Sequence, residues 1–218
     1  MGRTRISAAS RRLQILDVAM GLFARQGFAG TTTKQIAKHA GVTEALVFRH
    51  FSRKQDLYWA VIEYKCQATD VDGLRRKLAN GSDDLIMLAD IAEDVLRRNA
   101  EDQTLSRLLL FSALEQHQLS RRFFRTHIAE RYEILAAYIR KRIRQGGFHQ
   151  VNPLVAARGF LGMVVYHFLI QELFGGKHEQ KFDTREVSER LAAIWLDGMR
   201  TRNGRHASQV KTTRYAQP

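Results

Sequence analysis

The sequence predicts an all-α protein of about nine helices, and three observations support this fold class. Apolar residues recur at spacings of three and four along most of the chain, which is the period of one helix face. No stretch alternates apolar and polar residues in the way that a half-buried strand does. The 218 residues include only 2 prolines, so long segments are free of the strongest helix breaker.

Charge is distributed unevenly along a chain whose formal net charge is +13. Residues 1–66 hold 11 Lys and Arg against 4 Asp and Glu, whereas the two signs nearly balance over residues 67–203. A basic end of this kind suits a polyanionic partner, and general solubility is the alternative reading. The 44% of hydrophobic residues is enough to build a sizeable core.

Cysteine usage and hydropathy place the chain in a reducing, aqueous compartment. Cys66 is the only cysteine, which excludes a disulfide within the chain and a zinc site built on cysteines. The basic N-terminus is not followed by an apolar run, so we expect no signal peptide and a cytoplasmic protein. The longest charge-free apolar stretch, Gly159 to Gln171, has 13 residues, fewer than the ~20 that span a bilayer.

The first predicted helix covers residues 10–26, and two short helices follow it between Gly27 and Phe51. Thr32 stands three residues before Gln35 and ahead of an apolar pair, which is the pattern of a capping box. Gly41 then ends the first short helix, and Thr43 caps the second. Two helices joined by a three- or four-residue turn that contains glycine form a helix-turn-helix, whose second helix fits a DNA major groove.

A longer set of residues extends this motif on both sides. Its positions are Gly27-Phe28, Thr31-Thr32-Thr33, Ile36-Ala37, Ala40-Gly41-Val42-Thr43, Val47-Phe48, His50-Phe51, Lys54 and Leu57. In these residues and their spacing the chain resembles the N-terminal domain of TetR-family transcriptional regulators, and the resemblance runs without gaps over roughly residues 10–65.

The sequence departs from the family pattern at two positions. Ala45 stands where the family often has glycine. Phe48 stands where it usually has a tyrosine whose hydroxyl binds a DNA phosphate, so that polar contact is lost. Neither departure changes the predicted position of the second helix in the groove.

The resemblance and the helix geometry together predict the residues that contact DNA. Arg49 is placed to bind the edge of a guanine or, equally, a phosphate. Thr33 and Lys54 lie at helix N-termini, where backbone N–H groups favour phosphate. The alternative is an ordinary solvated face. The full predicted set is Thr33, Thr43, Glu44, Ala45, Phe48, Arg49, His50 and Lys54.

A short basic arm precedes the first helix. Residues 1–9 carry Arg3 and Arg5, and such an arm either enters a minor groove or remains a solvated tail. Arg11 and Arg12 follow in the first turn of the helix, where the helix dipole disfavours positive charge. We therefore expect these two arginines to find a partner, and a DNA phosphate is one candidate.

Six further helices are predicted after the helix-turn-helix. A helix over 53–70 links the DNA-binding domain, residues 10–65, to a C-terminal domain, residues 66–203, and a flexible tail over 204–218 closes the chain. The remaining helices cover 84–100, 103–118, 120–145, 153–173 and 184–201, with breakers at Gly73, Asn80-Gly81-Ser82 and Gly146-Gly147 between them.

The last two helices are the predicted homodimer interface. The 153–173 helix is apolar almost all round, which is more than burial on one side requires, and Gly159 and Gly162 permit close approach on one face. The resemblance implies the same arrangement, because two C-terminal helices of each TetR-like subunit form a four-helix interface. Burial in the core of the monomer explains part of the apolar surface.

Aromatic residues of the middle helices predict a pocket for a small-molecule effector, because TetR-like proteins usually sense small molecules. Plain core packing is the alternative for any single one of them. Glu115 is placed to pair with a cationic ligand. The predicted lining is Phe111, Glu115, Phe124, Phe160, Met163, Tyr166 and His167.

The sequence gives no sign of a catalytic or metal centre. It contains no Gly-rich phosphate loop, nucleophile elbow or HExxH motif. The pairs His127/Glu130 and Glu115/His117 have too few ligands for a metal site. We therefore expect no enzyme activity, no metal and no cofactor.

The function expected from the sequence is that of a dimeric transcriptional repressor that a small molecule releases from its DNA operator. Ligand binding would shift the 53–70 helix and change the spacing of the two reading helices. Two alternatives remain open. One is a DNA-binding activator or structural protein of the same fold without an inducer, and the other is an enzyme with an incidental helix-turn-helix.

Overall fold

The computed structural model describes residues 7–67, 71–79, 83–115 and 118–201. Within these ranges the protein is α-helical, and the only β-type pairing is an isolated bridge between Phe148 and Arg200. The all-α prediction is therefore confirmed. Most of the predicted arm, the tail over 204–218 and the breaker at Asn80-Gly81-Ser82 lie outside the described residues.

The chain divides into two compact units, which are described separately. The first comprises Met1–Asp70 and Asp102–His127, and the second comprises Val71–Glu101 and Ile128–Pro218. The helices of unit 1 are α1 (Ala8–Gln26), α2 (Thr33–His39), α3 (Glu44–His50), α4 (Lys54–Gln67), α7 (Thr104–Leu114) and α8 (Gln118–Phe123). A π-helical segment, η1 (Phe124–Ile128), follows at the boundary between the units.

The second unit is built around one long helix. Its elements are α5 (Val71–Ala79), α6 (Asp84–Glu101), α9 (Ala129–Arg144), α10 (Pro153–Phe168), the π-helical η2 (Leu169–Leu173), α11 (Gly176–Glu179) and α12 (Thr184–Met199). Each of the nine predicted helices has a counterpart in the structure, whereas α5 and α11 were not predicted. The helix predicted over 120–145 corresponds to α8, η1 and α9 together, because the α-helical geometry is interrupted by the π-helical segment η1.

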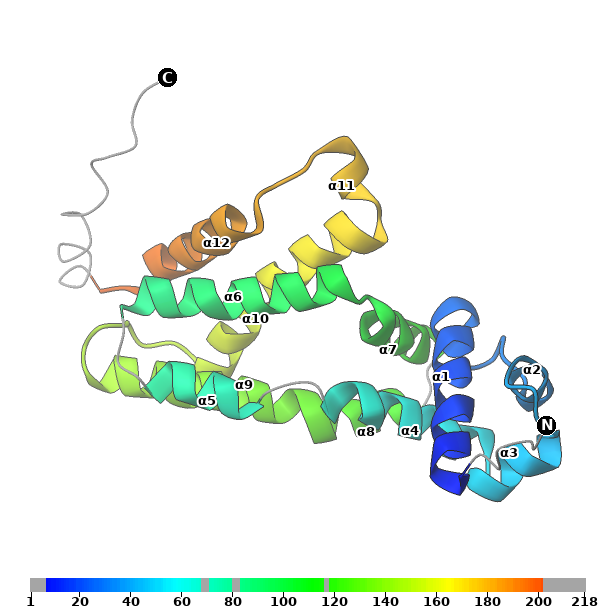
Figure 1. Cartoon of the computed structure of the whole chain (residues 1–218). Helices are drawn as coiled ribbons and strands as arrows, with labels where there is room; N and C mark the ends of the chain where they lie inside the picture. Colours follow the sequence, from blue (N-terminus) through cyan, green and yellow to red (C-terminus); the bar gives the residue numbers. More distant parts are fainter. Residues whose placement is uncertain (1–6, 68–70, 80–82, 116–117, 202–218) are drawn as a thin grey trace. The chain divides into compact units, whose positions relative to one another are not determined.

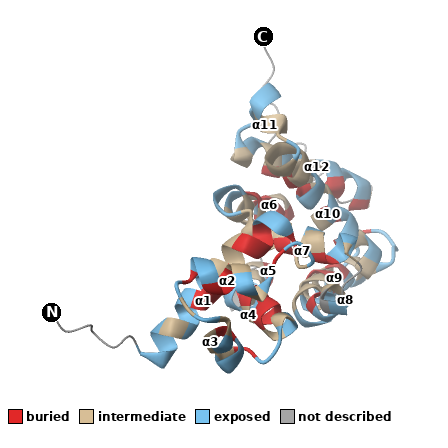
Figure 2. Ribbon diagram, turned by 90° about the vertical axis from the view of Figure 1, so that its right-hand side faces the viewer, coloured by how far each residue is buried: buried red, intermediate tan, exposed pale blue. Residues whose placement is uncertain are grey.

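The core of unit 1 forms where α1, α4 and α7 meet. Ile15, Phe23 and Tyr58 are fully buried there, as the red segments of α1 and α4 indicate (Figure 2). The ring of Tyr58 stands edge-on to that of Phe23 at 4.8 Å between centroids. Its hydroxyl donates a hydrogen bond to the carbonyl oxygen of Leu108 at 2.7 Å, so α7 is tied to α4 in the middle of the core.

Helix α7 is also tied to the start of the helix-turn-helix. Arg107 donates from Nε to the carbonyl oxygen of Ala24 at 2.8 Å, near the end of α1. At the other end of α7 the carboxylate of Glu115 accepts from the N–H of Ala29. Between these contacts Gly27 adopts φ +73°, and a Cβ at this position would lie 2.4 Å from Oε1 of Glu115. The positive φ favours glycine at this turn, and a side chain there would displace the carboxylate of Glu115.

In unit 2, α6 lies beside α12 and α10, and α5 lies beside α9 (Figure 1). Trp195 of α12 is at the centre of the core, because its ring stands edge-on to Phe148 at 5.8 Å and to Phe160 at 5.6 Å. Its indole N–H donates to the carbonyl oxygen of Ala156 at 3.1 Å. Aromatic packing and this hydrogen bond together fix α10 against α12.

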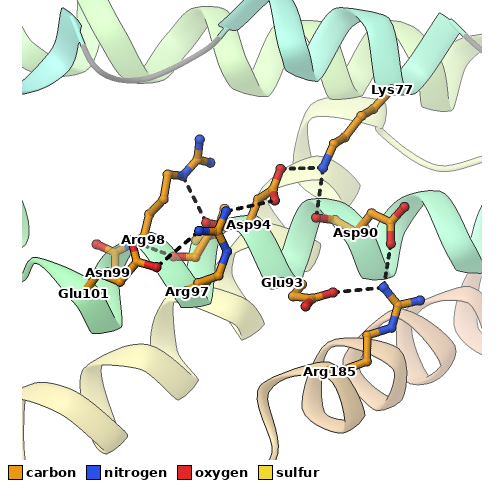
Figure 3. A network of polar contacts seen from close by, with 10 residues as sticks. Lys77, Asp90, Glu93, Asp94, Arg97, Arg98, Asn99, Glu101 and Arg185 are labelled. Carbon is orange, nitrogen blue, oxygen red and sulfur yellow. Dashed lines mark hydrogen bonds and ion pairs between the residues drawn. The ribbon is translucent and has the colours of Figure 1, made fainter.

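Charged residues reinforce the packing of α6 on both sides (Figure 3). Arg185 of α12 donates from one guanidinium nitrogen to Asp90 at 2.6 Å and to Glu93 at 2.9 Å. Lys77 of α5 is paired with Asp94 on another face of α6. Because these side chains are partly exposed, each pair stabilises the fold by less than about 1 kcal/mol.

The α10–η2 segment is the most apolar part of the described chain. Pro153–Leu173 is long and apolar enough to cross a membrane by length and composition alone, with a mean hydropathy of 1.6. The core helix of a water-soluble protein passes the same test, so this finding is weak support for a membrane span. Only 22% of the segment is buried in the single chain, which leaves a large apolar surface to be covered.

Candidate nucleic-acid interface

The first helix of the helix-turn-helix begins at a complete capping box. The hydroxyl of Thr32 accepts from the N–H of Gln35 at 3.1 Å, and the amide oxygen of Gln35 accepts from the N–H of Thr32 at 2.8 Å. The prediction of this cap from the sequence is confirmed. The reciprocal bonds satisfy two N–H groups that the first turn of a helix leaves free, so the start of α2 is firmly set.

The turn between α2 and α3 depends on Gly41, and α1 holds the turn in place. Gly41 has φ +62°, a conformation that residues with a Cβ rarely adopt. The N–H of Val42 returns to the carbonyl oxygen of Ala37 at 3.0 Å, which closes the end of α2. Gln14 of α1 then donates to the carbonyl oxygen of Ala40 at 2.9 Å. These hydrogen bonds, which all lie within unit 1, fix the angle between α2 and α3.

Helix α3 presents a small exposed face. Thr43 caps it by accepting from the N–H of Leu46 at 3.2 Å, and Val47 is buried against the unit. Ala45 and Arg49 are exposed, and 44% of Phe48 is accessible. These three side chains are free to meet a groove, which is what the prediction for them requires.

Two other predicted DNA-contact residues bind one another. The hydroxyl of Thr33, at the start of α2, donates to the carboxylate of Glu44 at 2.5 Å. Both side chains are half-buried, so the bond joins the N-terminal ends of α2 and α3. The hydroxyl proton of Thr33 is therefore occupied in the DNA-free protein, while its oxygen remains able to accept.

Lys54 and His50 are turned partly inward. The ammonium of Lys54 lies 4.2 Å from the ring centroid of Phe28. Burial lowers the pKa of Lys54, and the negative charge of Glu115 acts in the opposite direction. For His50, Nε2 is buried and has no hydrogen-bond partner among the described residues. Contact with DNA would require both side chains to reorient.

The arginines of the first turn of α1 find partners within the protein. Arg12 lies with its guanidinium 4.7 Å from the ring centroid of Phe51, and Arg11 donates to Gln14 at 2.7 Å. The two positive charges in the first turn of α1 therefore have contacts within the protein, although the helix dipole disfavours them there. No sequence pattern indicated the role of Gln14 as an anchor of the helix-turn-helix, because it depends on a contact across the fold.

The predicted ligand residues are divided between the two units. In unit 1, Phe111 is half-buried, 40% of Phe124 is exposed and the carboxylate of Glu115 is held by the N–H of Ala29. Glu115 also raises the pKa of Tyr58, although burial is the larger cause. These contacts give Glu115 a structural role beside the helix-turn-helix.

The other four predicted ligand residues belong to unit 2. Phe160 is fully buried and Met163 packs against the core, whereas 65% of Tyr166 is exposed. Of these four residues, His167 borders the cavity of about 230 Å³ in this unit. The other walls of that cavity were missed, although the polar interruption after the 153–173 helix, where Gly175-Gly176 and Lys177 stand, is a signal that could have found them.

The faces predicted for the homodimer are exposed in the single chain. On α10 the accessible positions Val155, Gly159, Gly162 and Tyr166 follow helical spacing and form one stripe. On α12, 62% of Ile194 is accessible, and nothing lies within 4 Å of a Cβ built at Gly198. An apolar stripe with glycines is suited to another helix. Among the described residues, no group of three His, Cys, Asp or Glu side chains is arranged to hold a metal ion.

Comparison with known proteins matches both parts of the chain. Residues 15–61 match the family of bacterial regulatory proteins of the tetR family. Residues 87–195, half of the chain, match the C-terminal domain of AefR-like transcriptional repressors. The HTH-type transcriptional regulator AcrR of Shigella flexneri is 43% identical over 61 residues, but this match spans only 28% of either chain.

Two further likenesses extend over most of the chain. The nucleoid occlusion factor SlmA of Vibrio campbellii is 31% identical over 160 residues, which are 71% of this chain and 80% of that protein. The crystal structure of the regulator FadR from Bacillus subtilis in complex with stearoyl-CoA shares the fold with a TM-score of 0.66 and 19% identity, covering 85% of this chain and 98% of FadR. The chain belongs to the TetR family of bacterial regulatory proteins, which are DNA-binding transcriptional regulators and not enzymes.

Proposed function

We propose that this protein is a homodimeric repressor that binds a near-palindromic DNA operator through α3. A small molecule that binds the protein releases it from this operator. The single observation that carries the proposal is the exposed face of Ala45, Phe48 and Arg49 on a helix that is capped by Thr43 and locked by the turn at Gly41. Members of the family bind DNA operators and small molecules and typically dimerise.

The proposed functions, DNA binding and effector binding with dimerisation, are assigned to two consecutive parts of the sequence. Residues 10–65 bind DNA, with Thr33, Lys54 and His50 joining the α3 face after they reorient. Residues 66–203 dimerise and bind the effector, and the protein acts in the cytoplasm, where its DNA is. Phosphate contacts supply most of the affinity, and contacts to base edges choose the sequence.

Dimerisation through α10 and α12 gives the geometry that an operator needs. Two copies of α3 related by a two-fold axis can enter successive major grooves if they lie about 34–36 Å apart. The exposed stripe on α10 and the accessible Ile194 on α12 support this interface, because a single chain leaves them open to water.

Repression is supported by one comparison, and release by a ligand is supported by another. The match to AefR-like repressors favours a repressor over an activator. FadR shares the fold and is seen with stearoyl-CoA, which supports a small-molecule effector in the C-terminal part. To shift the protein from 1% to 99% release, an effector must prefer the non-binding conformation by about 10⁴-fold, or about 5.5 kcal/mol.

Fluorescence anisotropy on DNA that flanks the protein's own gene tests the proposal. Scrambled DNA of equal length is the control, and both are titrated between about 50 and about 200 mM salt. We expect tighter binding to the native fragment that persists at the higher salt. Equal binding to both DNAs, lost steeply with salt, would mean that only the basic charge is engaged and would contradict an operator on this fragment.

A further inference from the structure

A cavity of about 230 Å³ lies within unit 2, near the C-terminal ends of α6 and α10. Leu96 and Ala100 of α6 form one wall, Phe168 closes the α10 side, and Lys181 and Phe182 border it from the segment before α12. All of these residues belong to the same compact unit. The cavity is therefore a property of one packed unit.

The size of the cavity limits what can fill it. An apolar cavity of about 150 Å³ holds benzene, while pockets for drug-sized ligands begin near 300 Å³. A volume of about 230 Å³ thus fits one aromatic ring with a small substituent. A long acyl chain or a fused polycyclic compound would extend beyond this volume.

The walls of the cavity suit an aromatic ring. Leu96 and Phe168 are almost fully buried and give it an apolar base. The rings of His167 and Phe182 meet edge-on at 5.7 Å between centroids, and both residues line the cavity. Aromatic pairs prefer such offset and edge-to-face arrangements, so a third ring can join them favourably.

The charges around the cavity favour an anion. Lys177 donates to the carboxylate of Glu172 at 2.6 Å, so these two charges offset one another. Lys181 has no ion pair among the described residues and is exposed at the rim. Burial lowers the pKa of His167, which keeps its imidazole neutral at pH 7. The remaining formal charge at the site is the ammonium of Lys181, which a carboxylate would complement.

The backbone beside the cavity is irregular in a way that places polar groups there. The helix that begins at Pro153 changes to π-helical geometry over η2, and Gln171 and Glu172 of this segment reach the cavity wall. Single π-helical turns inside α-helices often occur at functional sites. The turn that follows is tight, since a Cβ at Gly176 would lie 2.9 Å from the carbonyl oxygen of Ile170.

We propose that this cavity binds a monocyclic aromatic carboxylate, with the ring between Phe168 and Phe182 and the carboxylate at Lys181. Such a ligand contacts α6, η2 and the segment before α12 at once, so it stabilises one arrangement of these elements. Its role as the effector that releases DNA rests on the proposed function, whereas its binding does not.

Isothermal titration of the full-length, DNA-free protein with sodium benzoate tests binding directly. Benzamide has the same size without the charge, and benzylammonium carries the opposite charge. We expect benzoate to bind at least about tenfold more tightly than either, which corresponds to about 1.4 kcal/mol. Absence of benzoate binding, or equal affinity for all three compounds, would overturn the proposal.

Two variants locate the site. Lys181→Gln removes the rim cation and should weaken benzoate at least about fivefold, while Ala100→Leu fills the cavity from an exposed helix position and should abolish binding. Lys141→Gln, at an exposed lysine of α9 that is not part of the cavity wall, is the matched control and should bind as the unaltered protein does. Unchanged affinity in Ala100→Leu would overturn the site.

The regulatory consequence has its own readout. Benzoate should lower the anisotropy of the complex with the native DNA fragment, and it should leave the Ala100→Leu complex unchanged. Benzoate binding without any effect on DNA would support the site and contradict its role as the effector site. Failure of the protein to select the native DNA would instead contradict the proposed function and leave the binding result intact.

Discussion

The carboxylate of Glu115, at the C-terminal end of α7, accepts hydrogen bonds from the backbone N–H of Ala29 at 3.2 and 3.3 Å. This contact joins α7 to the loop that leads into the helix-turn-helix. The same carboxylate contributes negative charge beside Lys54. Glu115 is thus a positioning residue between α7 and the DNA-binding helices.

Replacement of Glu115 by alanine should destabilise unit 1 by about 0.5–1.5 kcal/mol, because the exposed N–H of Ala29 then exchanges the carboxylate for water. Glu115→Gln retains an acceptor oxygen and should lose less than half as much. Urea denaturation followed by circular dichroism measures both. Asp17→Ala, at an exposed carboxylate of α1, is the control. Equal stability of Glu115→Ala and the unaltered protein would show that the contact does not hold α7 in place.

Removal of the Arg49 side chain should weaken binding to the native DNA fragment by about 1–3 kcal/mol, the worth of a good bidentate contact to a base. The side chain is exposed on α3, so Arg49→Ala should leave folding and dimerisation intact. Anisotropy against native and scrambled DNA is the measurement. Arg144→Ala removes an exposed arginine from unit 2 and controls for net charge.

The pattern of the loss distinguishes the two roles that remain open for Arg49. A loss confined to the native fragment assigns it to a base edge, and an equal loss on both DNAs assigns it to a phosphate. Unchanged affinity on both would remove Arg49 from the interface.

A charge at Ile194 should break the proposed homodimer. The residue is 62% exposed on α12, and Ile194→Glu would place an unpaired carboxylate of each subunit in the proposed interface, which should weaken association by at least about tenfold. Analytical ultracentrifugation measures the effect. Ile86→Glu changes a similarly exposed isoleucine of α6, at 51%, and should remain dimeric. If both variants behave alike, the interface does not include this face of α12.

The sequence predicted those parts of the helix-turn-helix that depend on neighbouring residues. The capping box of Thr32 and Gln35, the glycine of the turn and the cap at Thr43 are local, so their residue types are sufficient to identify them. Helix α5 was missed because Gly73 was interpreted as a breaker. A glycine inside a helix costs only about 1 kcal/mol, and burial of Leu78 offsets that cost.

Tertiary contacts decide the features that the sequence did not reveal. The inward direction of Lys54 depends on Phe28 and on Glu115, which comes from a distant part of the chain. The cavity in unit 2 depends equally on which side chains of α6 face the segment before α12. The helical spacing of apolar residues indicates that a residue lies on the inner face of its helix. It does not indicate which other helix or segment that residue contacts.

The ion pair of Asp102 and Lys65 should make the stability of unit 1 depend on pH below about 4. Burial raises the pKa of Asp102, but hydrogen bonds from Lys65 and from Thr104 outweigh it, and the pKa falls from 3.8 to about 2. A carboxylate whose pKa is lower in the folded state stabilises that state above its unfolded pKa. This contribution is lost as the pH falls from about 4 to about 2.

Asp102→Asn should therefore be less stable than the unaltered protein at pH 7, by no more than about 1 kcal/mol because the pair is partly exposed, and the difference should vanish near pH 2. Asparagine can still accept the hydrogen bond from the N–H of Thr104, so the start of α7 is retained. Urea midpoints of the two proteins at several pH values between 2 and 7 measure the difference, and Asp17→Asn, at an exposed carboxylate of α1, is the control. A difference that stays constant over this range would assign the loss to packing, because only a change of protonation makes the contribution of Asp102 depend on pH.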